Sequence, residues 1–302
     1  MRIRYSFSSR RTGQIEGRNN HRKSFPEIVK EVIKNADILL EILDARFIDD
    51  TRNLEVEEMV NRQKKKLVYV LNKADLIETS QAREYMEANK LYPYVFVSCK
   101  DRQGGKQLRD RIKIEANKVR KAKEDKIKKQ REEKAKDDKE PNILDAVPQI
   151  GVIGYPNTGK SSIINLLIGK ASARTAPTSG CTRGIQKIKL TEDIFIIDTP
   201  GVLPSKENVV EKTDMTKQVK IGARDFDRVK NPENVVADLM VKYPNVIEKC
   251  YHLDIDAKGD PELLIEILGR KKSFLKKGNQ VDIDRTCRLI LRDWQEGKIR
   301  VN

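Results

Sequence analysis

The chain has 302 residues, 38% of them hydrophobic, and carries a formal net charge of +15. This length allows about two domains, and no apolar run approaches the roughly 20 residues of a membrane-spanning helix, which excludes a helical membrane protein. The positive charge predicts attraction to polyanions such as nucleic acid or an anionic membrane surface. The four cysteines form no CxxC pair, so we expect a reduced, cytoplasmic protein without a zinc site.

The first 24 residues are rich in arginine and serine and contain a single acid. Such a composition is also found in transit peptides. However, Gly13, Gly17 and the pair Asn19-Asn20 would interrupt the amphipathic helix that a transit peptide forms. A basic arm that contacts RNA is therefore the better interpretation.

Short apolar runs then alternate with helical patterns up to about residue 204. Most runs are continuously apolar, as in parallel strands that are buried on both faces. Strands that alternate with helices predict a doubly wound α/β domain, here over 25–204. The strands are expected over 38–43, 67–71, 95–97, 150–153, 185–190 and 194–197, and the helices over 25–35, 51–65, 80–89 and 160–168.

Two loops that follow predicted strands carry groups suited to a guanine base. The segment 72–75 reads Asn-Lys-Ala-Asp and fits the pattern NKxD. The Asp75 carboxylate can accept hydrogen bonds from both N1–H and N2–H₂ of guanine, whereas adenine offers no such pair of donors. A second loop, 98–100, can close over guanine O6. The nucleotide-binding residues expected here are Asn72, Lys73, Asp75, Ser98, Cys99 and Lys100.

The segment 106–140 is strongly charged for part of a compact domain. Leu108, Ile112 and Ala116 keep a helical face at first, but from 117 to 140 nearly every residue is Lys, Arg, Asp or Glu. A solvated, charged helical linker or a disordered linker explains this pattern. The alternative is a basic arm that contacts RNA, because positive charges outnumber negative ones.

The segment 154–161, Gly-Tyr-Pro-Asn-Thr-Gly-Lys-Ser, fits the phosphate loop GxxxxGK[ST] without a mismatch. Backbone N–H groups at the start of the next helix wrap the β-phosphate, and glycines adopt conformations that side chains forbid. Lys160 neutralises the β- and γ-phosphates, and the Ser161 hydroxyl ligates Mg²⁺. The phosphate-binding residues expected here are Asn157, Thr158, Gly159, Lys160, Ser161 and Ser162.

Two further segments are expected to complete the magnesium site. Asp198 follows a predicted strand and begins the pattern DxxG, which ends at Gly201. The acid holds the Mg²⁺ water shell, and the Gly201 N–H can reach the γ-phosphate. Thr182, in the loop before that strand, can complete Mg²⁺ coordination when a γ-phosphate is present. The alternative for Thr182 is an ordinary turn residue.

Helical patterns dominate after residue 204 and predict a smaller all-α domain over 205–302. Proline near two starts and glycine just past two ends mark helices over 232–243, 261–268 and 282–295. Basic clusters at 270–272 and 276–277 predict contacts with RNA phosphates. No aromatic platform for single strands accompanies them, so structured RNA is the expected target.

The motifs stand in rotated order, because NKxD and the 98–100 loop precede the phosphate loop and DxxG comes last. With Asp44-Ala-Arg46 after the first strand, the segment 198–203 and the C-terminal stretch 263–298, this chain resembles the circularly permuted YlqF/RbgA-type GTPases. The resemblance implies a P-loop GTPase fold and a C-terminal helical bundle that contacts rRNA. It further implies a role in assembly of the large ribosomal subunit, in a bacterial- or archaeal-like member of the family.

The group that orients the attacking water must differ from the glutamine that follows DxxG in signalling GTPases, because Val202 stands there. His21 matches the family's N-terminal catalytic histidine in spacing, and an imidazole can orient water. The alternatives are a loop histidine or an RNA contact. Asn157 matches the position that holds K⁺ in related GTPases, and the alternative is an asparagine that satisfies local backbone.

These residues favour an enzyme with His21, Lys160 and Thr182 as its catalytic residues and with Mg²⁺ and K⁺ as cofactors. Hydrolysis of GTP to GDP would release the protein from rRNA and the large subunit. The alternative is an RNA-binding placeholder that uses GTP as a structural lock. Charge, motif order and Val202 disfavour a signalling switch. We expect a monomer with no membrane partner.

Overall fold

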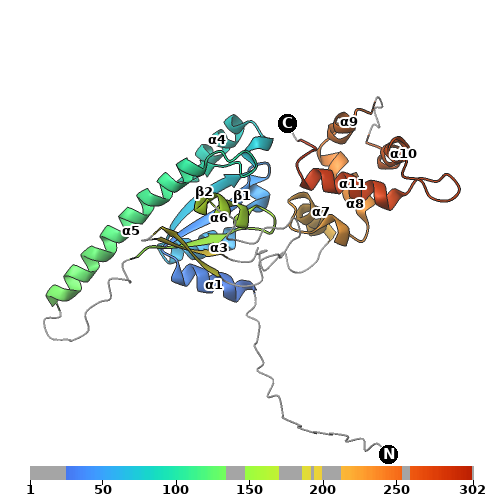
Figure 1. Ribbon diagram of the computed structural model, residues 1–302. Coiled ribbons are helices and arrows are strands. Elements are labelled where there is room, and N and C mark those ends of the chain that lie inside the picture. Colours follow the sequence, from blue (N-terminus) through green and yellow to red (C-terminus); the bar gives the residue numbers. More distant parts are fainter. Residues whose placement is uncertain are drawn as a thin grey trace, which may run out of the picture.

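The computed structural model describes residues 25–133, 147–169, 186–191, 194–198, 212–253 and 259–300. An α/β part with one sheet lies beside a group of helices within 212–300, here called the C-terminal bundle (Figure 1). The arm 1–24 and the expected site residues His21, Thr182 and Gly201 lie outside the described residues. Within the described ranges, no helix combines the length and the apolar character needed to cross a membrane.

In the part of the chain that the structure describes, six strands form one sheet in the order β3-β2-β1-β4-β6-β5. Neighbouring strands are parallel except for the edge pair β5 and β6. All seven residues of β1 are buried, which explains the continuously apolar runs of the sequence. The strands are β1 Ile38–Asp44, β2 Lys66–Asn72, β3 Tyr94–Phe96, β4 Gln149–Ile153, β5 Gln186–Thr191 and β6 Ile194–Asp198.

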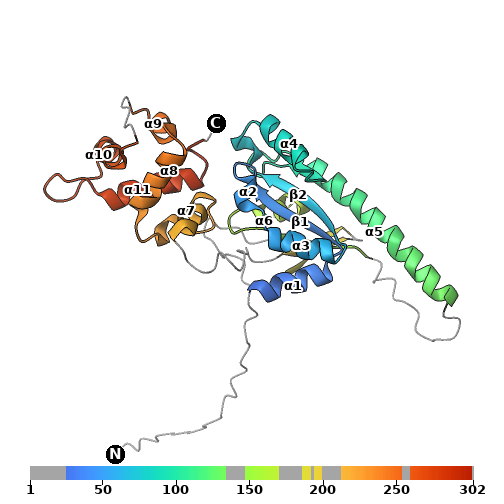
Figure 2. The same cartoon turned by 180° about the vertical axis from the view of Figure 1, so that it is seen from behind.

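Helices cover both faces of this sheet, which confirms the predicted doubly wound α/β fold. Successive residues of a strand point to opposite faces, so Leu39 enters a cluster with α1 and α3 while Leu40 enters one with α5 and α6. Figure 2 shows α1 and α3 against the face turned to the viewer. These helices are α1 Phe25–Asn35, α3 Leu54–Arg62, α5 Gly105–Glu133 and α6 Lys160–Ile168; α4 Thr79–Ala88 lies at the β3 side of the sheet.

The helix expected over 51–65 is two helices, α2 Ile48–Thr51 and α3 Leu54–Arg62. Arg52 is the C-cap of the first helix, and Asn53 caps the second, because its side-chain oxygen accepts from the Val56 N–H at 3.2 Å. The Asn53 N–H itself donates to the buried Glu41 carboxylate at 2.8 Å. A tertiary contact therefore divides a segment whose local pattern suits one helix.

The charged segment after β3 forms the single 29-residue helix α5. Its first half packs on the sheet through Leu108, Ile112 and Ala116, all at most 2% exposed. Lys123 donates to Asp37 at 2.8 Å and ties the helix to the start of β1. Beyond this ion pair α5 extends past the edge of the sheet (Figure 1). The structure thus confirms the helical interpretation up to residue 133.

Among the described residues after 211, five α-helices make up the C-terminal bundle, and α11 contacts α7, α8 and α10. Two of them escaped the sequence prediction: α7 is too polar to show an apolar face, and α9 has only six residues. The bundle consists of α7 Lys212–Lys220, α8 Pro232–Lys242, α9 Val246–Tyr251, α10 Pro261–Lys271 and α11 Ile283–Gln295.

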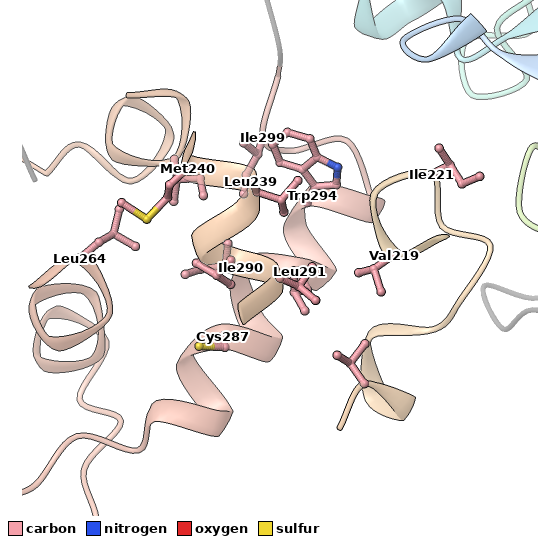
Figure 3. Close-up of a cluster of buried hydrophobic side chains, with 14 of the residues drawn as sticks. Val219, Ile221, Leu239, Met240, Leu264, Cys287, Ile290, Leu291, Trp294 and Ile299 are labelled. Atoms are coloured by element: carbon pink, nitrogen blue, oxygen red, sulfur yellow. The ribbon is translucent and has the colours of Figure 1, made fainter. Parts of the chain in front are cut away.

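Trp294 lies in the core of this bundle with Leu239, Leu291 and Ile299 around it (Figure 3). Its side chain is fully buried, and the indole N–H donates to the Lys220 carbonyl at 3.1 Å. A buried indole needs such a partner for its polar edge. The ring also stacks on Phe47, whose centroid lies 6.2 Å away in the α/β part. The bundle core therefore includes a residue from the first βα loop.

Candidate nucleotide site

The phosphate loop connects β4 to α6 in a conformation that depends on glycine. Gly154 has a φ of +146° and Gly159 a φ of +98°. A Cβ atom on Gly159 would lie 2.1 Å from the Asn72 side-chain nitrogen, so no larger residue fits there. This close approach aims the N-terminal turn of α6, with Ser161 and Ser162, at the carboxyl edge of the sheet.

Asn72 joins the two halves of the predicted site. Its Nδ2 donates to the Thr158 carbonyl at 2.8 Å, across 86 residues of chain. Because β1 alone separates β2 from β4 in the sheet, the NKxD loop and the phosphate loop meet at one edge. The structure thus brings together segments that the sequence order separates.

Lys160 and Thr158 are buried within the phosphate loop. The Lys160 Nζ donates to the carbonyl oxygens of Gly154 at 3.2 Å and Tyr155 at 2.6 Å. The Thr158 hydroxyl also donates to Tyr155, at 3.0 Å. The loop is therefore folded around the Lys160 ammonium, and this positive charge suits a polyphosphate. The Thr158 side chain stabilises the loop conformation through its bond to Tyr155.

Asp75, the predicted base-recognition residue, is held in place by Ser98. The Ser98 hydroxyl donates to Asp75 Oδ1 at 2.8 Å and accepts from the Asp101 N–H at 3.0 Å. Asp75 lies in a 3-10 turn, Ala74–Leu76, that follows Lys73 in the left-handed conformation (φ +61°). Ser98 therefore serves to orient the carboxylate that was predicted to read guanine.

The other two residues of the 98–100 loop differ in exposure. Cys99 is partly buried, and burial, with a smaller contribution from the Asp75 carboxylate, raises the pKa of its thiol to about 12. The thiol is thus neutral near pH 7 and unsuited to nucleophilic chemistry. Lys100 is exposed at the surface of the loop.

Asp44, at the end of β1, is a site residue that the sequence analysis used only as a mark of resemblance. It is fully buried and accepts from the Lys73 Nζ at 2.8 Å. Arg46 donates to both oxygens of the same carboxylate, at 3.0 and 2.8 Å. Burial alone would raise the Asp44 pKa, but Lys73 and Arg46 hold it well below its usual range. The sequence signal that could have identified Asp44 as a site residue was its place as an acid at the end of a strand, like the NKxD motif itself.

Two of the residues expected to bind Mg²⁺ belong to elements that end or begin at the same edge of the sheet. Ser161 is the second residue of α6, and Asp198 is the last residue of β6, which pairs with β4. Asn157 has a φ of +59°, and its Nδ2 donates to the Gly222 carbonyl at 2.7 Å. Its Oδ1 is then the atom that a K⁺ would use.

Comparison with known proteins agrees with this geometry. Residues 149–249 match the family described as 50S ribosome-binding GTPase. The chain is 37% identical to an uncharacterized GTP-binding protein of Methanocaldococcus jannaschii, over 90% of this chain and 65% of that protein. It is 32% identical to Nucleolar GTP-binding protein 2 of Pneumocystis carinii, over 88% and 51%. The chain thus spans between half and two thirds of the length of these relatives.

Two solved structures of YlqF share the fold. GDP-bound YlqF aligns with a TM-score of 0.57 at 21% identity, covering 91% of this chain and 96% of that one. GNP-bound YlqF from T. maritima aligns with a TM-score of 0.56 at 20% identity, covering 91% and 95%. Because these alignments cover nearly the full length of both chains, the sheet and the bundle follow one common arrangement.

Proposed function

Since this chain belongs to the circularly permuted GTPases, we propose that it binds GTP with Mg²⁺ and hydrolyses it on a precursor of the large ribosomal subunit. One contact carries the nucleotide part of this proposal. The hydrogen bond from Asn72 to Thr158 holds the base-recognition loop against the phosphate loop, so that one nucleotide can reach both. The Ser98-oriented carboxylate of Asp75 then selects guanine over adenine.

The phosphates and Mg²⁺ are bound at the α6 end of the site. The first N–H groups of α6 and the Lys160 ammonium stabilise the negative charge of the β- and γ-phosphates. Ser161, Asp198 and Thr182 would hold Mg²⁺, which neutralises charge that develops on the phosphate oxygens. We assign Gly201 to the γ-phosphate on the DxxG pattern.

His21 is proposed to orient the attacking water, since Val202 cannot. His21→Ala should then slow hydrolysis stimulated by the partner by about 10²–10⁴-fold, the range expected for loss of a general base. Nucleotide affinity should stay the same. Equal stimulated turnover in variant and wild type would return His21 to a loop or RNA-contacting role.

Potassium is proposed to bind Asn157 and to supply positive charge beside the phosphates. The amide is already oriented by the Gly222 carbonyl, which leaves Oδ1 for the cation. Hydrolysis should accordingly be faster in K⁺ than in Na⁺ at equal ionic strength. Equal rates in the two salts would leave Asn157 a loop residue that satisfies the Gly222 backbone.

The RNA part of the proposal is supported by charge and by the relatives. The bundle carries an exposed basic cluster beside the α10–α11 turn, and the whole chain has a net charge of +15. Matched proteins are described as ribosome-binding or nucleolar. We assign GTP hydrolysis to residues 25–204 and rRNA binding to 205–302, in a cytoplasmic monomer. The exposed cluster comprises Arg270, Lys271, Lys272, Lys276 and Lys277.

GTP turnover in K⁺ buffer, with and without purified large and small ribosomal subunits, tests this function. Stimulation by the large subunit alone is the expected result. Tight GTP binding and large-subunit binding without stimulated turnover would favour the second candidate, a placeholder that uses GTP as a structural lock. Failure to bind guanine nucleotides would overturn both.

A further inference from the structure

Arg46 connects the nucleotide site to the C-terminal bundle. Its guanidinium is 2% exposed, and Nε and Nη2 donate hydrogen bonds to the two carboxylate oxygens of Asp44. The remaining arm, Nη1, donates to the Trp294 carbonyl in α11 at 3.1 Å. All three guanidinium nitrogens are therefore engaged, two on the α/β side and one on the bundle. A planar fork of fixed geometry makes such a bridge rigid.

The same carboxylate fixes the lysine of the NKxD motif. Lys73 Nζ and Arg46 Nη2 both donate to Asp44 Oδ2, each at 2.8 Å. Lys73 also has a left-handed backbone, so its side chain leaves the loop in a defined direction. The position of the Lys73 ammonium thus depends on Asp44, and the position of Asp44 depends on Arg46.

A second contact ties the base-recognition turn to the end of α11. Gly297 has a φ of +74°, and a Cβ atom there would lie 2.3 Å from Cδ1 of Leu76, the residue after Asp75. The Gly297 N–H donates to the Trp294 carbonyl, the same oxygen that Arg46 contacts. One carbonyl therefore receives hydrogen bonds from both sides of the boundary.

The phosphate loop also contacts the bundle. Asn157 donates to the Gly222 carbonyl at 2.7 Å, and Tyr155 is fully buried in the bundle's apolar cluster. Lys160 binds the Tyr155 carbonyl at 2.6 Å. Both loops that would hold a nucleotide are thus in direct contact with the bundle.

We infer that Asp44 and Arg46 are positioning residues for Lys73 and that, through Trp294, they link guanine-nucleotide binding to docking of the C-terminal bundle. Because linkage is reciprocal, nucleotide that orders the base loop must also tighten the bundle, and displacement of the bundle must weaken nucleotide binding. A partner that pulls on the bundle would then promote nucleotide release. This inference rests on the proposed binding of guanine nucleotide.

The test uses the full chain with GDP as the probe and two variants, Arg46→Gln and Arg46→Lys. Both lose the fork, and Arg46→Lys keeps the positive charge and so protects against failure to fold. The affinity of each variant for GDP should be at least about tenfold lower than that of wild type, within the usual range of coupling between sites. In wild type, GDP should also slow hydrogen exchange in the segment 286–299, and in both variants this protection should be lost.

Arg52→Gln is the matched control. Arg52 also grips a carboxylate with two nitrogens, Nε and Nη2 to Glu57 at 2.8 Å each, but both residues lie in the α/β part. This control should lose stability and yet keep GDP affinity and GDP-dependent protection of 286–299. A merely structural role for Arg46 would give the same pattern.

Failure of this inference can be told apart from failure of the proposed function. Wild type that binds no guanine nucleotide would overturn both. Wild type that binds GDP, with protection of 286–299 preserved in Arg46→Gln or Arg46→Lys, would overturn the linkage alone.

Discussion

Two acids on β1 are buried to the same degree, yet their pKa values shift in opposite directions. Asp44 and Glu41 are both fully buried and lie three residues apart, on opposite faces of the strand. Asp44 meets two cations, and its pKa falls. Glu41 accepts one N–H, from Asn53, and burial together with the nearby Glu57 carboxylate raises its pKa to about 8. Partners, not burial, decide which acid is ionised.

The two acids also differ in what surrounds them. Around Asp44 the cations are Lys73 of the NKxD loop and Arg46, which also contacts α11. Around Glu41, Arg52 is already bound by Glu57, and Tyr69 donates to Glu57 as well. Among the described residues, Glu41 Oε2 has no hydrogen-bond partner. In this environment the protonated, neutral form of Glu41 is therefore lower in free energy than the charged carboxylate.

Asp44→Asn should have the largest effect on stability. The substitution keeps the shape but leaves the Arg46 guanidinium, 2% exposed, without a countercharge. Removing one partner of a buried ion pair costs about 3–5 kcal/mol. Urea denaturation of wild type and variant at pH 7 measures this loss. A change below 1 kcal/mol would mean that Asp44 is not the group that compensates Arg46.

Comparison of wild type with Glu41→Gln should show that Glu41 makes the free energy of unfolding fall as pH rises. An acid whose pKa is lowered on folding has the opposite effect. Between pH 4.5 and about 8 the unfolded state has lost the Glu41 proton while the folded state keeps it, so stability falls as pH rises. The slope approaches about 1.4 kcal/mol per pH unit, or about 2–3 kcal/mol from pH 5 to pH 7. The glutamine variant lacks this slope, so its stability relative to wild type should increase with pH.

Denaturation curves at several pH values from 5 to 8 decide this point. Asp44 predicts the reverse behaviour, because a depressed pKa adds stability that is present above pH 3.8 and lost as pH falls below it. Parallel curves for wild type and Glu41→Gln would show that Glu41 is ionised in the folded state after all.

The sequence alone predicted the parts of the candidate site that depend on local chemistry. The phosphate loop needs glycine at 159 and a lysine at 160 at the start of a helix, and α6 begins at Lys160 as expected. Continuous apolar runs located the strands, because parallel strands are buried on both faces. The order of the motifs then predicted the permuted fold, which the structure confirms.

Features that depend on contacts between distant segments were not predictable. Asn72 was expected to bind nucleotide, but its bond to Thr158 requires knowledge that β2 and β4 flank β1. The break at Asn53 needs the buried Glu41, and α7 is stabilised by contacts with α8 and α11 instead of by an apolar pattern of its own. Arg46 looked like part of a short family motif until its bond to Trp294 became visible.

Asn53→Ala should have the smallest effect and separates the two contacts that this residue makes near Glu41. The side-chain cap on Val56 is lost, at a cost of about 1 kcal/mol, while the backbone N–H still donates to Glu41. The destabilisation measured by urea should therefore be equal at pH 5 and pH 8. A larger loss of stability at pH 8 would mean that the Asn53 side chain also holds α2 and α3 in place around an ionised Glu41. Asp44 and Glu41 would then both be ionised in the folded protein and would differ only in how strongly their charge is stabilised.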